Sequence, residues 1–520
     1  MSNTDLNTAR SSTRFEETAP LSDVDVIVIG TGFSGLGMAS QLARHTDKTF
    51  VVLERANDVG GTWRDNHYPG AACDQPSHLY SLSFRPNPEW SSVFGDQAEI
   101  WKYLQDTARE EGLLPHIHFN SEVTRASWSE ETNSWTVRTP LGEHRGRILV
   151  SASGLLSDPK LPDIPGLGEF AGDVFHSARW NHDVSLSGKR VAVVGTGASA
   201  IQLIPELAEE VEHLTVFQRT PPWVVPRPDR LYTEAEKGVF RKIPETMMEL
   251  RSSIFWENEE RFAQRAAIPA LLAKVKAIAL EHLVAQVSDP ELRRKLTPDY
   301  EPGCKRILKS SNYYPAFERE NVSLVASGLA RIEGNELIGA DGSRQTVDAL
   351  VLCTGFEATE PPIAERIYGH EALSLSDRWR GGAEAYKATS VSGFPNFFVL
   401  GGPNTGIGHN SQVYMFEAQI KHVMRVLEHM DLAQIETVEV TEAAEARFRA
   451  SLDDRSAGTV WLTGGCASWY IDDRNGRLTT LWPDYSHAFE LEVSTFEASD
   501  YAFTLTANAR ECTQVPVGAS

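Results

Sequence analysis

The sequence contains few cysteines, and no two of them stand close together in the chain. Only five occur among 520 residues. They are Cys73, Cys304, Cys353, Cys466 and Cys512. An odd number without CxxC spacing argues against a disulfide framework and against a zinc site built from cysteine pairs. The pattern is typical of a reducing compartment, so we expect a cytoplasmic protein that binds no metal.

Positive charge and long apolar runs are also scarce. Lys and Arg number 49 against 71 Asp and Glu, which gives a formal net charge of −22. A surface this acidic repels polyphosphate backbones and argues against nucleic acid as a partner. No apolar run reaches the roughly 18 residues that a membrane-spanning helix needs. Residues 1–20 are polar and predict a disordered tail rather than a secretory signal.

The chain does contain two copies of a strand, a glycine-rich turn and a helix. The first copy has a β-branched run at 24–29, a helix-like stretch at 36–44 and a second apolar run at 50–53. Its turn reads Gly30-Thr31-Gly32-Phe33-Ser34-Gly35. A continuous apolar strand is typical of a parallel sheet that is buried on both faces. The combination predicts a dinucleotide-binding unit.

Each glycine of the first turn has a physical role. Gly30 permits the tight turn, Gly32 lets the backbone approach a pyrophosphate, and Gly35 lets helix and strand pack closely. The helix N-terminus that follows offers free N–H groups to the anion. Glu54 follows the second strand, where its carboxylate can accept hydrogen bonds from ribose hydroxyls and would repel a 2′-phosphate. This site therefore favours FAD or NAD over NADP.

The second copy has strands at 191–194 and 214–217 and a helix at 201–209. Its turn reads Gly195-Thr196-Gly197-Ala198-Ser199-Ala200. The second strand ends without an acid and is followed by Arg219 and Thr220. A guanidinium can pair with a 2′-phosphate through charge-assisted hydrogen bonds, and a hydroxyl can add another. The second site therefore favours NADPH.

The two units predict an α/β fold with two doubly wound, Rossmann-like dinucleotide-binding domains. A long stretch rich in Glu, Lys, Arg, Ala and Leu, with few glycines, predicts a helical insertion. The expected division is 1–20 for the tail, 21–155 and 386–520 for the FAD-binding domain, 156–225 and 300–385 for the NADP-binding domain, and 226–299 for the insertion.

Sites for FAD and NADPH on one chain restrict the chemistry. Electrons pass from NADPH through flavin either to an acceptor or to O₂. Disulfide reductases share this layout, but they need a redox cysteine pair beside the flavin, and the sequence shows no such pair.

Three further stretches resemble the Baeyer–Villiger monooxygenases. Residues 60–74, GGTWRDNHYPGAACD, are similar to the family's Gly-Gly-x-Trp and Tyr-Pro-Gly-x-x-x-Asp segment. The FxGxxxHxxxW pattern at 170–180 is similar to the family fingerprint, and residues 304–306, CKR, to its catalytic arginine region. The fingerprint here is followed by Asn181, and a later strand-end motif has Cys353 in place of alanine. The resemblance covers nearly the whole chain.

The resemblance implies that reduced flavin and O₂ form a C4a-peroxide, which converts a ketone to an ester or lactone. It assigns Arg306 as the fixed positive charge beside the peroxide, since arginine does not lose its proton. It assigns Asp74 to hold that guanidinium and Lys305 to reach the NADP 2′-phosphate. Further cofactor contacts are expected at Thr62, Trp63, Tyr80, Val123 and Gln202.

Several other segments carry expectations about the site. His176 and Trp180 resemble residues on the linker between the two domains, and we interpret them as hinge and packing residues. The glycine-rich loop at 401–406 leads to a helix-like stretch at 411–426, whose N-terminus we expect to face the flavin. Three tryptophans, Trp223, Trp469 and Trp482, are either pocket residues or part of the core.

Two related activities and one binding function remain as alternatives. An N- or S-oxygenating flavin monooxygenase uses a protonated hydroperoxide and does not need Arg306. An NADPH oxidase-type flavoprotein would consume NADPH without an oxygenated product. A non-catalytic flavoprotein would only bind its cofactor. The residues specify neither one ketone nor an oligomeric state.

Overall fold

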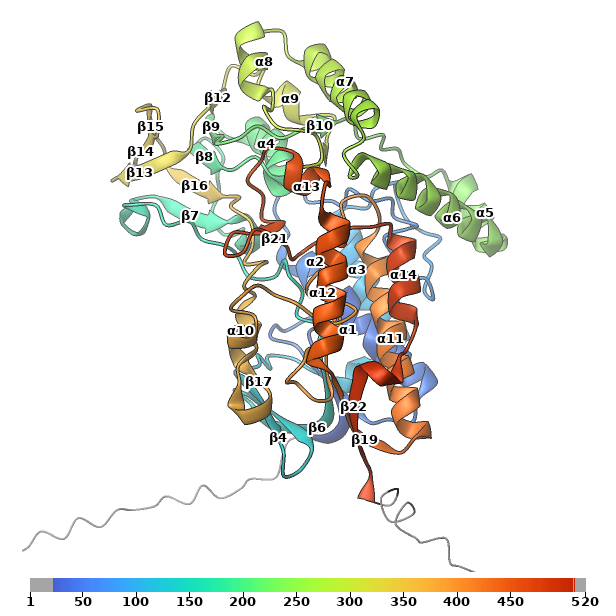
Figure 1. Cartoon of the computed structure of the whole chain (residues 1–520). Helices are drawn as coiled ribbons and strands as arrows, with labels where there is room; N and C mark the ends of the chain where they lie inside the picture. The colour runs from blue at the N-terminus through green and yellow to red at the C-terminus, as the bar shows by residue number, and fades with distance from the viewer. Residues whose placement is uncertain (1–21, 508, 510–520) are drawn as a thin grey trace, which may run out of the picture.

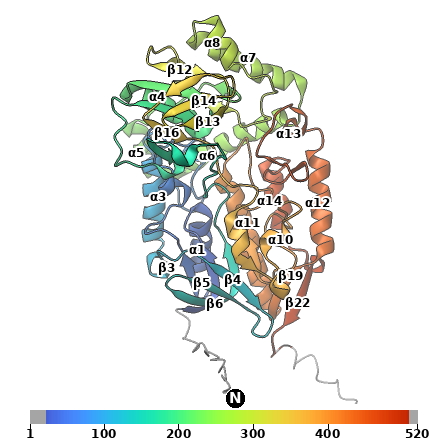
Figure 2. The ribbon, with the colours of Figure 1, turned by 90° about the vertical axis from the view of Figure 1, so that its left-hand side faces the viewer.

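The computed structural model describes residues 22–507 and residue 509. The predicted tail at 1–20 lies outside these residues. Two sheets lie one above the other along the length of the molecule, and a group of helices lies beside the upper sheet (Figure 1). The view turned by 90° shows the same two levels (Figure 2). The predicted α/β class with two Rossmann-like domains and a helical insertion is confirmed.

The lower sheet has eight strands and contains the first predicted unit. In order across the sheet they are β17 (Ile367–Tyr368), β4 (Arg125–Ser129), β5 (Ser134–Thr139), β6 (Gly142–Ser151), β1 (Ser22–Ile29), β2 (Phe50–Leu53) and β3 (Ile117–His118), with β18 (Phe397–Val399) also paired to β6. Strand β1 lies between the parallel strands β2 and β6, which explains its continuous apolar run. Strands β4, β5 and β6 form an antiparallel meander that the pattern did not predict.

Helices from both ends of the chain cover the lower sheet. They are α1 (Phe33–His45), α2 (Thr62–Asp65), α3 (Gln97–Glu110), α10 (Leu375–Arg378), α11 (Gln412–Leu432), α12 (Glu442–Ser456) and α14 (Ser486–Ser494). Two strands far apart in sequence, β19 (Ile435–Val440) and β22 (Tyr501–Leu505), form an antiparallel pair.

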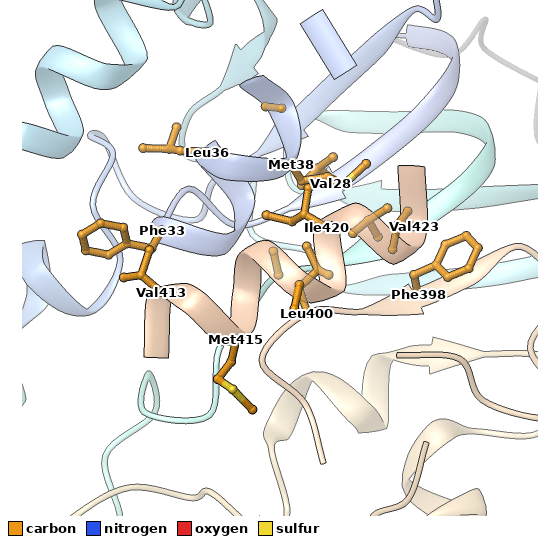
Figure 3. Packing of buried hydrophobic residues seen from close by; sticks show 14 of the residues in the cluster. Val28, Phe33, Leu36, Met38, Phe398, Leu400, Val413, Met415, Ile420 and Val423 are labelled. Carbon is orange, nitrogen blue, oxygen red and sulfur yellow. The ribbon is translucent and has the colours of Figure 1, made fainter. Parts of the chain in front are cut away.

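The main core lies where α1 packs against α11 (Figure 3). Gly37 of α1 allows this close approach, since a Cβ there would stand 2.9 Å from the Ile420 side chain. Val28 from β1 and Phe398 from β18 belong to the same cluster. An early segment and a late segment of the chain therefore share one core.

The upper sheet has five strands, all parallel, and contains the second predicted unit. In order they are β12 (Val322–Val325), β9 (His213–Phe217), β8 (Arg190–Val194), β16 (Ala349–Leu352) and β7 (Asp173–His176). Helices α4 (Ala198–Glu210) and α9 (Tyr313–Ala316) contact each other beside it, and β13 (Leu329–Glu333), β14 (Glu336–Gly339) and β15 (Arg344–Thr346) form a small antiparallel sheet.

The predicted insertion is helical. It consists of α5 (Glu234–Lys242), α6 (Pro244–Glu260), the 3-10 turn η4 (Arg261–Gln264), α7 (Pro269–Gln286) and α8 (Pro290–Leu296). Strands β10 (Val224–Val225) and β11 (Leu308–Lys309) pair where the chain leaves and returns. Helix α13 (Val460–Thr463) packs against the insertion, and β20 (Ile471–Asp472) and β21 (Arg477–Leu478) form the short hairpin that the Asn475-Gly476 pair predicts.

A buried carboxylate fastens the insertion to the lower sheet's helices. Glu259 of α6 accepts hydrogen bonds from Asn410 Nδ2 at 2.7 Å and His409 Nε2 at 3.2 Å, directly before α11. It also accepts bonds from the backbone N–H groups of Ser486 at 3.2 Å and His487 at 3.1 Å, at the start of α14. Burial opposes ionisation, but these donors hold the pKa of Glu259 below its usual range.

One segment differs from the expected division of the chain. Residues 367–368 fall in the range expected for the NADP-binding domain, 300–385. In the structure they form β17, which pairs with β4 at the edge of the lower sheet. The chain therefore returns from the upper half to the lower half before β17. The sequence pattern did not show this, because the position of β17 is set by its pairing with β4.

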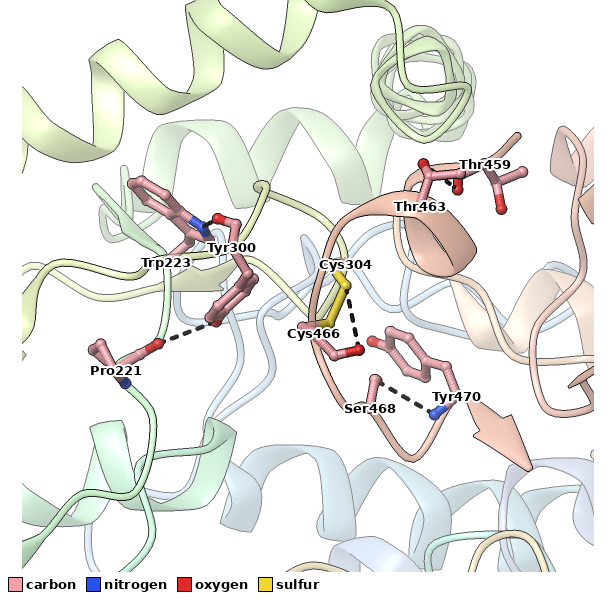
Figure 4. The surroundings of a disulfide bond; sticks show 9 residues. All are labelled: Pro221, Trp223, Tyr300, Cys304, Thr459, Thr463, Cys466, Ser468 and Tyr470. Atoms are coloured by element: carbon pink, nitrogen blue, oxygen red, sulfur yellow. Dashed lines mark hydrogen bonds between the residues drawn. A yellow bond between two sulfur atoms is a disulfide. The ribbon is translucent and has the colours of Figure 1, made fainter. Parts of the chain in front are cut away.

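A disulfide in the described part of the chain corrects the expectation drawn from cysteine spacing. Cys304 and Cys466 are bonded although 162 residues separate them in sequence (Figure 4). Folding brings together two loops whose separation gives no local signal. Cys73 and Cys353 are free. The cysteine argument for a reducing compartment is thereby weakened, and the cytoplasmic location stays a prediction. Among the described residues, no helix is both long and apolar enough to cross a bilayer.

Truncating the α1–α11 contact should destabilise the lower half. Ile420 is only 2% exposed, so Ile420→Ala should lower the free energy of unfolding by about 2–5 kcal/mol. Leu432 at the end of the same helix is 79% exposed, and Leu432→Ala should change it by less than about 0.5 kcal/mol. Urea unfolding followed by tryptophan fluorescence measures both. Equal midpoints for the two variants would contradict the assigned core.

Candidate active site

One cavity of about 1110 Å³ brings both glycine turns together. It is lined by residues of the lower sheet, the upper sheet and the 401–412 segment. Of the residues expected to bind cofactor or to act in catalysis, all but two line it. The lining members are Gly30, Gly32, Phe33, Ser34, Glu54, Thr62, Trp63, Asp74, Tyr80, Val123, Gly195, Thr196, Gly197, Ala198, Ser199, Gln202, Arg219, Thr220, Lys305 and Arg306.

The first glycine turn has the geometry that its sequence predicts. Gly30 has φ +99°, and a Cβ there would stand 2.7 Å from the carbonyl oxygen of Ala152. Gly35 does not line the cavity, because it packs so closely that a Cβ would stand 1.9 Å from the Gly30 oxygen. A Cβ at Gly32 would have no heavy atom within 4 Å other than those of Gly32 and its two chain neighbours. The turn therefore leaves open backbone at its second glycine, where a pyrophosphate is expected.

The second turn repeats this geometry. Gly195 has φ +112°, and a Cβ there would stand 2.4 Å from the carbonyl oxygen of Cys353. A Cβ at Gly197 would likewise have no heavy atom within 4 Å beyond its chain neighbours. Ala200, the other residue that does not line the cavity, is fully buried in α4. Its methyl group takes the packing role of the third glycine.

Glu54 is buried and held at both carboxylate oxygens. One oxygen accepts the backbone N–H of Thr31 at 3.1 Å, and the other accepts Ala56 N–H and Arg64 Nη1, both at 2.9 Å. Arg64 also donates to Asp65 at 2.7 Å. These bonds fix the direction of the Glu54 carboxylate at the cavity wall, where a sugar hydroxyl could reach it.

The far side of the cavity carries two cations. Arg219 is exposed, and the described residues provide it with no carboxylate within salt-bridge distance. Lys305 lies over the ring of Tyr300, with its ammonium 5.2 Å from the ring centroid. Burial and the nearby charge of Arg219 lower the pKa of Lys305. Two neighbouring cations facing one cavity fit an anionic group such as a 2′-phosphate. Thr220 is held there by a bond from Thr196 Oγ1 to its carbonyl, 3.0 Å long.

The predicted catalytic pair is in direct contact. Arg306 donates from Nε to Asp74 Oδ2 at 2.9 Å and from Nη2 to Oδ1 at 2.7 Å. The side chains remain 34% and 23% exposed, and both line the cavity. Asp74 raises the pKa of Arg306, which keeps the guanidinium charged. Although burial works against it, the cations around Asp74 hold the pKa of its carboxyl below the usual value.

A second cation, Lys309 on β11, faces the same pair. Its Nζ donates to the backbone carbonyl of Asp74 at 2.8 Å and lies 5.4 Å from the ring centroid of Phe94. Burial lowers its pKa to about 8, although Asp74 acts in the opposite direction. The sequence analysis missed this residue, because a lone lysine within a short strand gives no signal of burial.

Aromatic rings form another wall of the cavity. Trp63 Nε1 donates to the Tyr80 hydroxyl at 3.1 Å, and the two rings meet edge to face. Phe33 meets Tyr80 edge to face as well, with ring centroids 5.1 Å apart. Of the three tryptophans left open between pocket and core, Trp469 lines the cavity and is 48% exposed, whereas Trp223 and Trp482 are buried in the core. Its neighbour Tyr470 also lines the cavity and was not predicted.

Gln202 joins the two halves of the site. It accepts the Tyr68 hydroxyl at 2.8 Å and donates to the carbonyl of Ala72 at 2.9 Å. Gly70 between them approaches α4 closely, since a Cβ there would stand 2.6 Å from the Gln202 carbonyl. The Tyr-Pro-Gly segment that resembles the family is thus the contact between the first half and the helix of the second turn.

His176 and Trp180 lie at the end of β7, outside the cavity lining. His176 Nδ1 accepts the backbone N–H of Ala178 at 3.1 Å, and burial lowers its pKa to about 4. Trp180 packs edge to face on Phe175. A neutral, buried histidine agrees with a packing role rather than with acid–base chemistry. Gln412, the first residue of α11, lines the cavity, so the N-terminus of this helix does reach it.

Comparisons with known proteins agree with this geometry. The family described as "Flavin-binding monooxygenase-like" matches residues 23–236. A Baeyer–Villiger monooxygenase of Streptomyces coelicolor is 48% identical, with 92% of each chain covered, and one of Pseudomonas aeruginosa is 43% identical with the same coverage. Cyclohexanone monooxygenase from Rhodococcus sp. Phi1 bound to NADP⁺ aligns with a TM-score of 0.83 and 30% identity, covering 94% of this chain and 100% of that one.

These two Baeyer–Villiger monooxygenases are well above 30% identical to this chain and cover nearly its whole length. The chain belongs to the Baeyer–Villiger monooxygenases.

Proposed function

We propose that the enzyme converts ketones to esters or lactones with NADPH and O₂. The observation that carries this proposal is the bidentate Arg306–Asp74 ion pair in a cavity shared by two dinucleotide turns. FAD, when bound, accepts hydride from NADPH and activates O₂. The protein's own groups decide what the activated oxygen meets.

The two turns fit their expected cofactors. Gly32 presents open backbone to the cavity, and the aligned carboxylate of Glu54 suits the ribose of FAD. Gly197 presents open backbone on the other side, where Arg219 and Lys305 suit the 2′-phosphate of NADPH. A related structure in the comparison, OTEMO, is a complex with FAD and NADP, with a TM-score of 0.83 and 28% identity.

Arg306 supplies a permanent positive charge at the reacting oxygen. A fixed guanidinium stabilises negative charge on that oxygen and on the carbonyl oxygen of a ketone under attack. Asp74 orients the guanidinium through two hydrogen bonds, and Lys309 holds the backbone of Asp74. An electrophilic N- or S-oxygenation would need no such charge, so this arrangement favours ketone oxidation.

A cyclic ketone is the first substrate class that we propose. Several structural neighbours are cyclohexanone monooxygenases, one of them bound to ε-caprolactone, with a TM-score of 0.81 and 29% identity. Incubating the enzyme with NADPH and a cyclic ketone, an aliphatic ketone or a thioether tests the proposal by product mass. Sulfoxide formation without ester or lactone would favour the N/S-oxygenating alternative, and NADPH consumption without product the oxidase.

Arg306→Ala should abolish oxygenation but leave hydride transfer measurable. The lost charge acts only where negative charge develops, so lactone formation should fall by at least about 10²–10³-fold. Stopped-flow bleaching of the flavin follows the first step and product mass the second. Because Asp74 would be left without its main partner, Arg306→Lys provides a variant that keeps the charge while losing the bidentate geometry. Lactone formation at the wild-type rate in Arg306→Ala would remove the proposed role.

Arg219→Ala should weaken NADPH binding selectively. Loss of hydrogen bonds to a charged phosphate should raise the KM for NADPH about ten- to a hundredfold and change that for NADH little. Arg331, paired with Glu333 on β13 and absent from the cavity lining, provides the matched control as Arg331→Ala. An equal rise of both KM values would mean that the 2′-phosphate is bound elsewhere.

The pKa of Lys309 predicts a loss of coupling in alkaline solution. As pH rises through about 8, Lys309 loses its charge, and product formed per NADPH consumed should fall. The other charged or titratable groups around it are Asp74, Arg306, Arg261 and Cys73. Lys309→Met should lose this pH dependence, and Lys309→Arg should keep its charge across the range. Product and NADPH measured between about pH 6 and pH 10 test this. An unchanged alkaline limb in Lys309→Met would assign it to another group.

A further inference from the structure

A covalent bond joins two walls of the cavity next to the catalytic ion pair. The disulfide connects the arginine loop, residues 301–306, to the wall segment, residues 464–470 (Figure 4). Lys305 and Arg306 line the cavity directly after Cys304, and residues 467–470 line it directly after Cys466. Neither cysteine lines the cavity itself, but each is bonded to a residue that does.

The wall segment is anchored at its far end, where Tyr470 packs in a buried cluster and its carbonyl accepts the Thr480 hydroxyl at 3.1 Å. It contains neither helix nor strand between α13 and β20. A backbone hydrogen bond from Glu301 to Gly464, 2.9 Å long, accompanies the disulfide. Tyr470 at its end is buried, which raises the pKa of its hydroxyl, and it is close enough to Arg306 for that charge to oppose the rise. The segment therefore places an aromatic hydroxyl beside the guanidinium.

On the insertion side the arginine loop meets one exposed ion pair, with Lys276 Nζ 3.8 Å from Glu301 Oε1, and one buried cation. Arg265 of the insertion is buried beneath the loop, where a Cβ on Gly303 would stand 2.7 Å from its Nη1. Its Nη2 donates to the carbonyl of Gly408 at 3.1 Å, and the described residues provide no carboxylate for it. Burial and the charge of Arg306 lower the pKa of Arg265 to about 10. The two guanidinium groups repel each other across the loop.

We propose that the Cys304–Cys466 disulfide is a positioning crosslink for the oxygenation step. It holds the wall segment, with Trp469 and Tyr470, against the loop that carries Arg306. With the bond closed, the cavity keeps one shape around the guanidinium and excludes water. With the bond open, residues 464–469 are free to move and water enters the cavity. The two electrons of NADPH then leave on O₂ as hydrogen peroxide, and no ester or lactone forms.

The crosslink opens by ordinary thiol–disulfide exchange. A dithiol reductant attacks one sulfur, the Cys304–Cys466 bond breaks, and the reductant leaves as its own internal disulfide. Two electrons and two protons pass to the protein, which gains a thiol at each cysteine. The enzyme's coupling thus depends on the thiol state of its surroundings.

This inference rests on the ketone oxidation proposed above, and its test separates the two. The variant is Cys304→Ala/Cys466→Ala, and Cys512→Ser, outside the described residues, is the matched cysteine control. Product formed per NADPH should fall about fivefold or more in the double variant. Without the crosslink the wall segment must be ordered in each turnover, and ordering the backbone of one residue alone costs about 1–2 kcal/mol. The rate of hydride transfer should stay within about twofold of wild type, a barrier change below about 0.5 kcal/mol, since neither cysteine lines the cavity.

Two readouts do not depend on turnover. Alkylation and peptide mass under non-reducing conditions should find Cys304 and Cys466 in one linked peptide pair. Chymotrypsin should cleave after Trp469 or Tyr470 faster in the double variant and in dithiothreitol-treated wild type. The treated wild type should also show the lower coupling, which tests the idea without any substitution, whereas the double variant should not respond to dithiothreitol.

The outcomes are distinct. If untreated wild type forms no ester or lactone from any ketone, the proposed function fails. If wild type forms product but the double variant matches Cys512→Ser in coupling and in cleavage rate, the crosslink has no positioning role. Two free thiols at 304 and 466 in active, untreated enzyme would overturn the inference as well.

Discussion

The ion pair between Arg306 and Asp74 is the contact on which the organisation of this enzyme depends. The two residues are 232 positions apart, one following the helical insertion and the other in the loop before α3. Their bidentate bond can form only when both nucleotide-binding halves and the insertion are in place. The pair thereby couples the folding of three regions to the assembly of one reactive charge. Both side chains line the cavity, so the Arg306 guanidinium can face Asp74 on one side and a substrate on the other.

Charge is distributed against the overall composition. The chain has a net charge of −22, yet Arg219, Lys305 and Arg306 line its cavity, and Arg306 and Lys309 flank the Asp74 carboxylate. The field that an anionic cofactor meets is therefore local, set by a few cations within reach of the cavity rather than by the surface as a whole. The two open glycine turns add backbone N–H groups, which also favour an anionic cofactor. Carboxylates line the cavity too, but Glu54 and Asp74 are each paired with an arginine.

Local pattern and long-range contact were not equally predictable from the sequence. Both nucleotide turns could be found because one short stretch supplies strand, glycines, helix and the charge at the strand end. Arg306 and Asp74 could be paired only through resemblance to a family, since nothing near either residue points to the other. Lys309, the Cys304–Cys466 bond and the meander β4–β5–β6 were missed or misjudged, because their character arises from distant segments folded over them. Strand β17 shows the same limit at a domain boundary.

The anchoring of the insertion by Glu259 has a consequence for protein engineering. The donors that this carboxylate accepts, from His409, Asn410, Ser486 and His487, belong to a different part of the chain from the helix that bears it. Transplanting the insertion from a relative without an acid at this position would leave the buried donors of His409 and Ser486 unpaired, at about 1–3 kcal/mol each. A functional chimera must therefore exchange α6 together with the segments at the starts of α11 and α14 that donate to Glu259. The unit to be transferred is thus discontinuous in sequence.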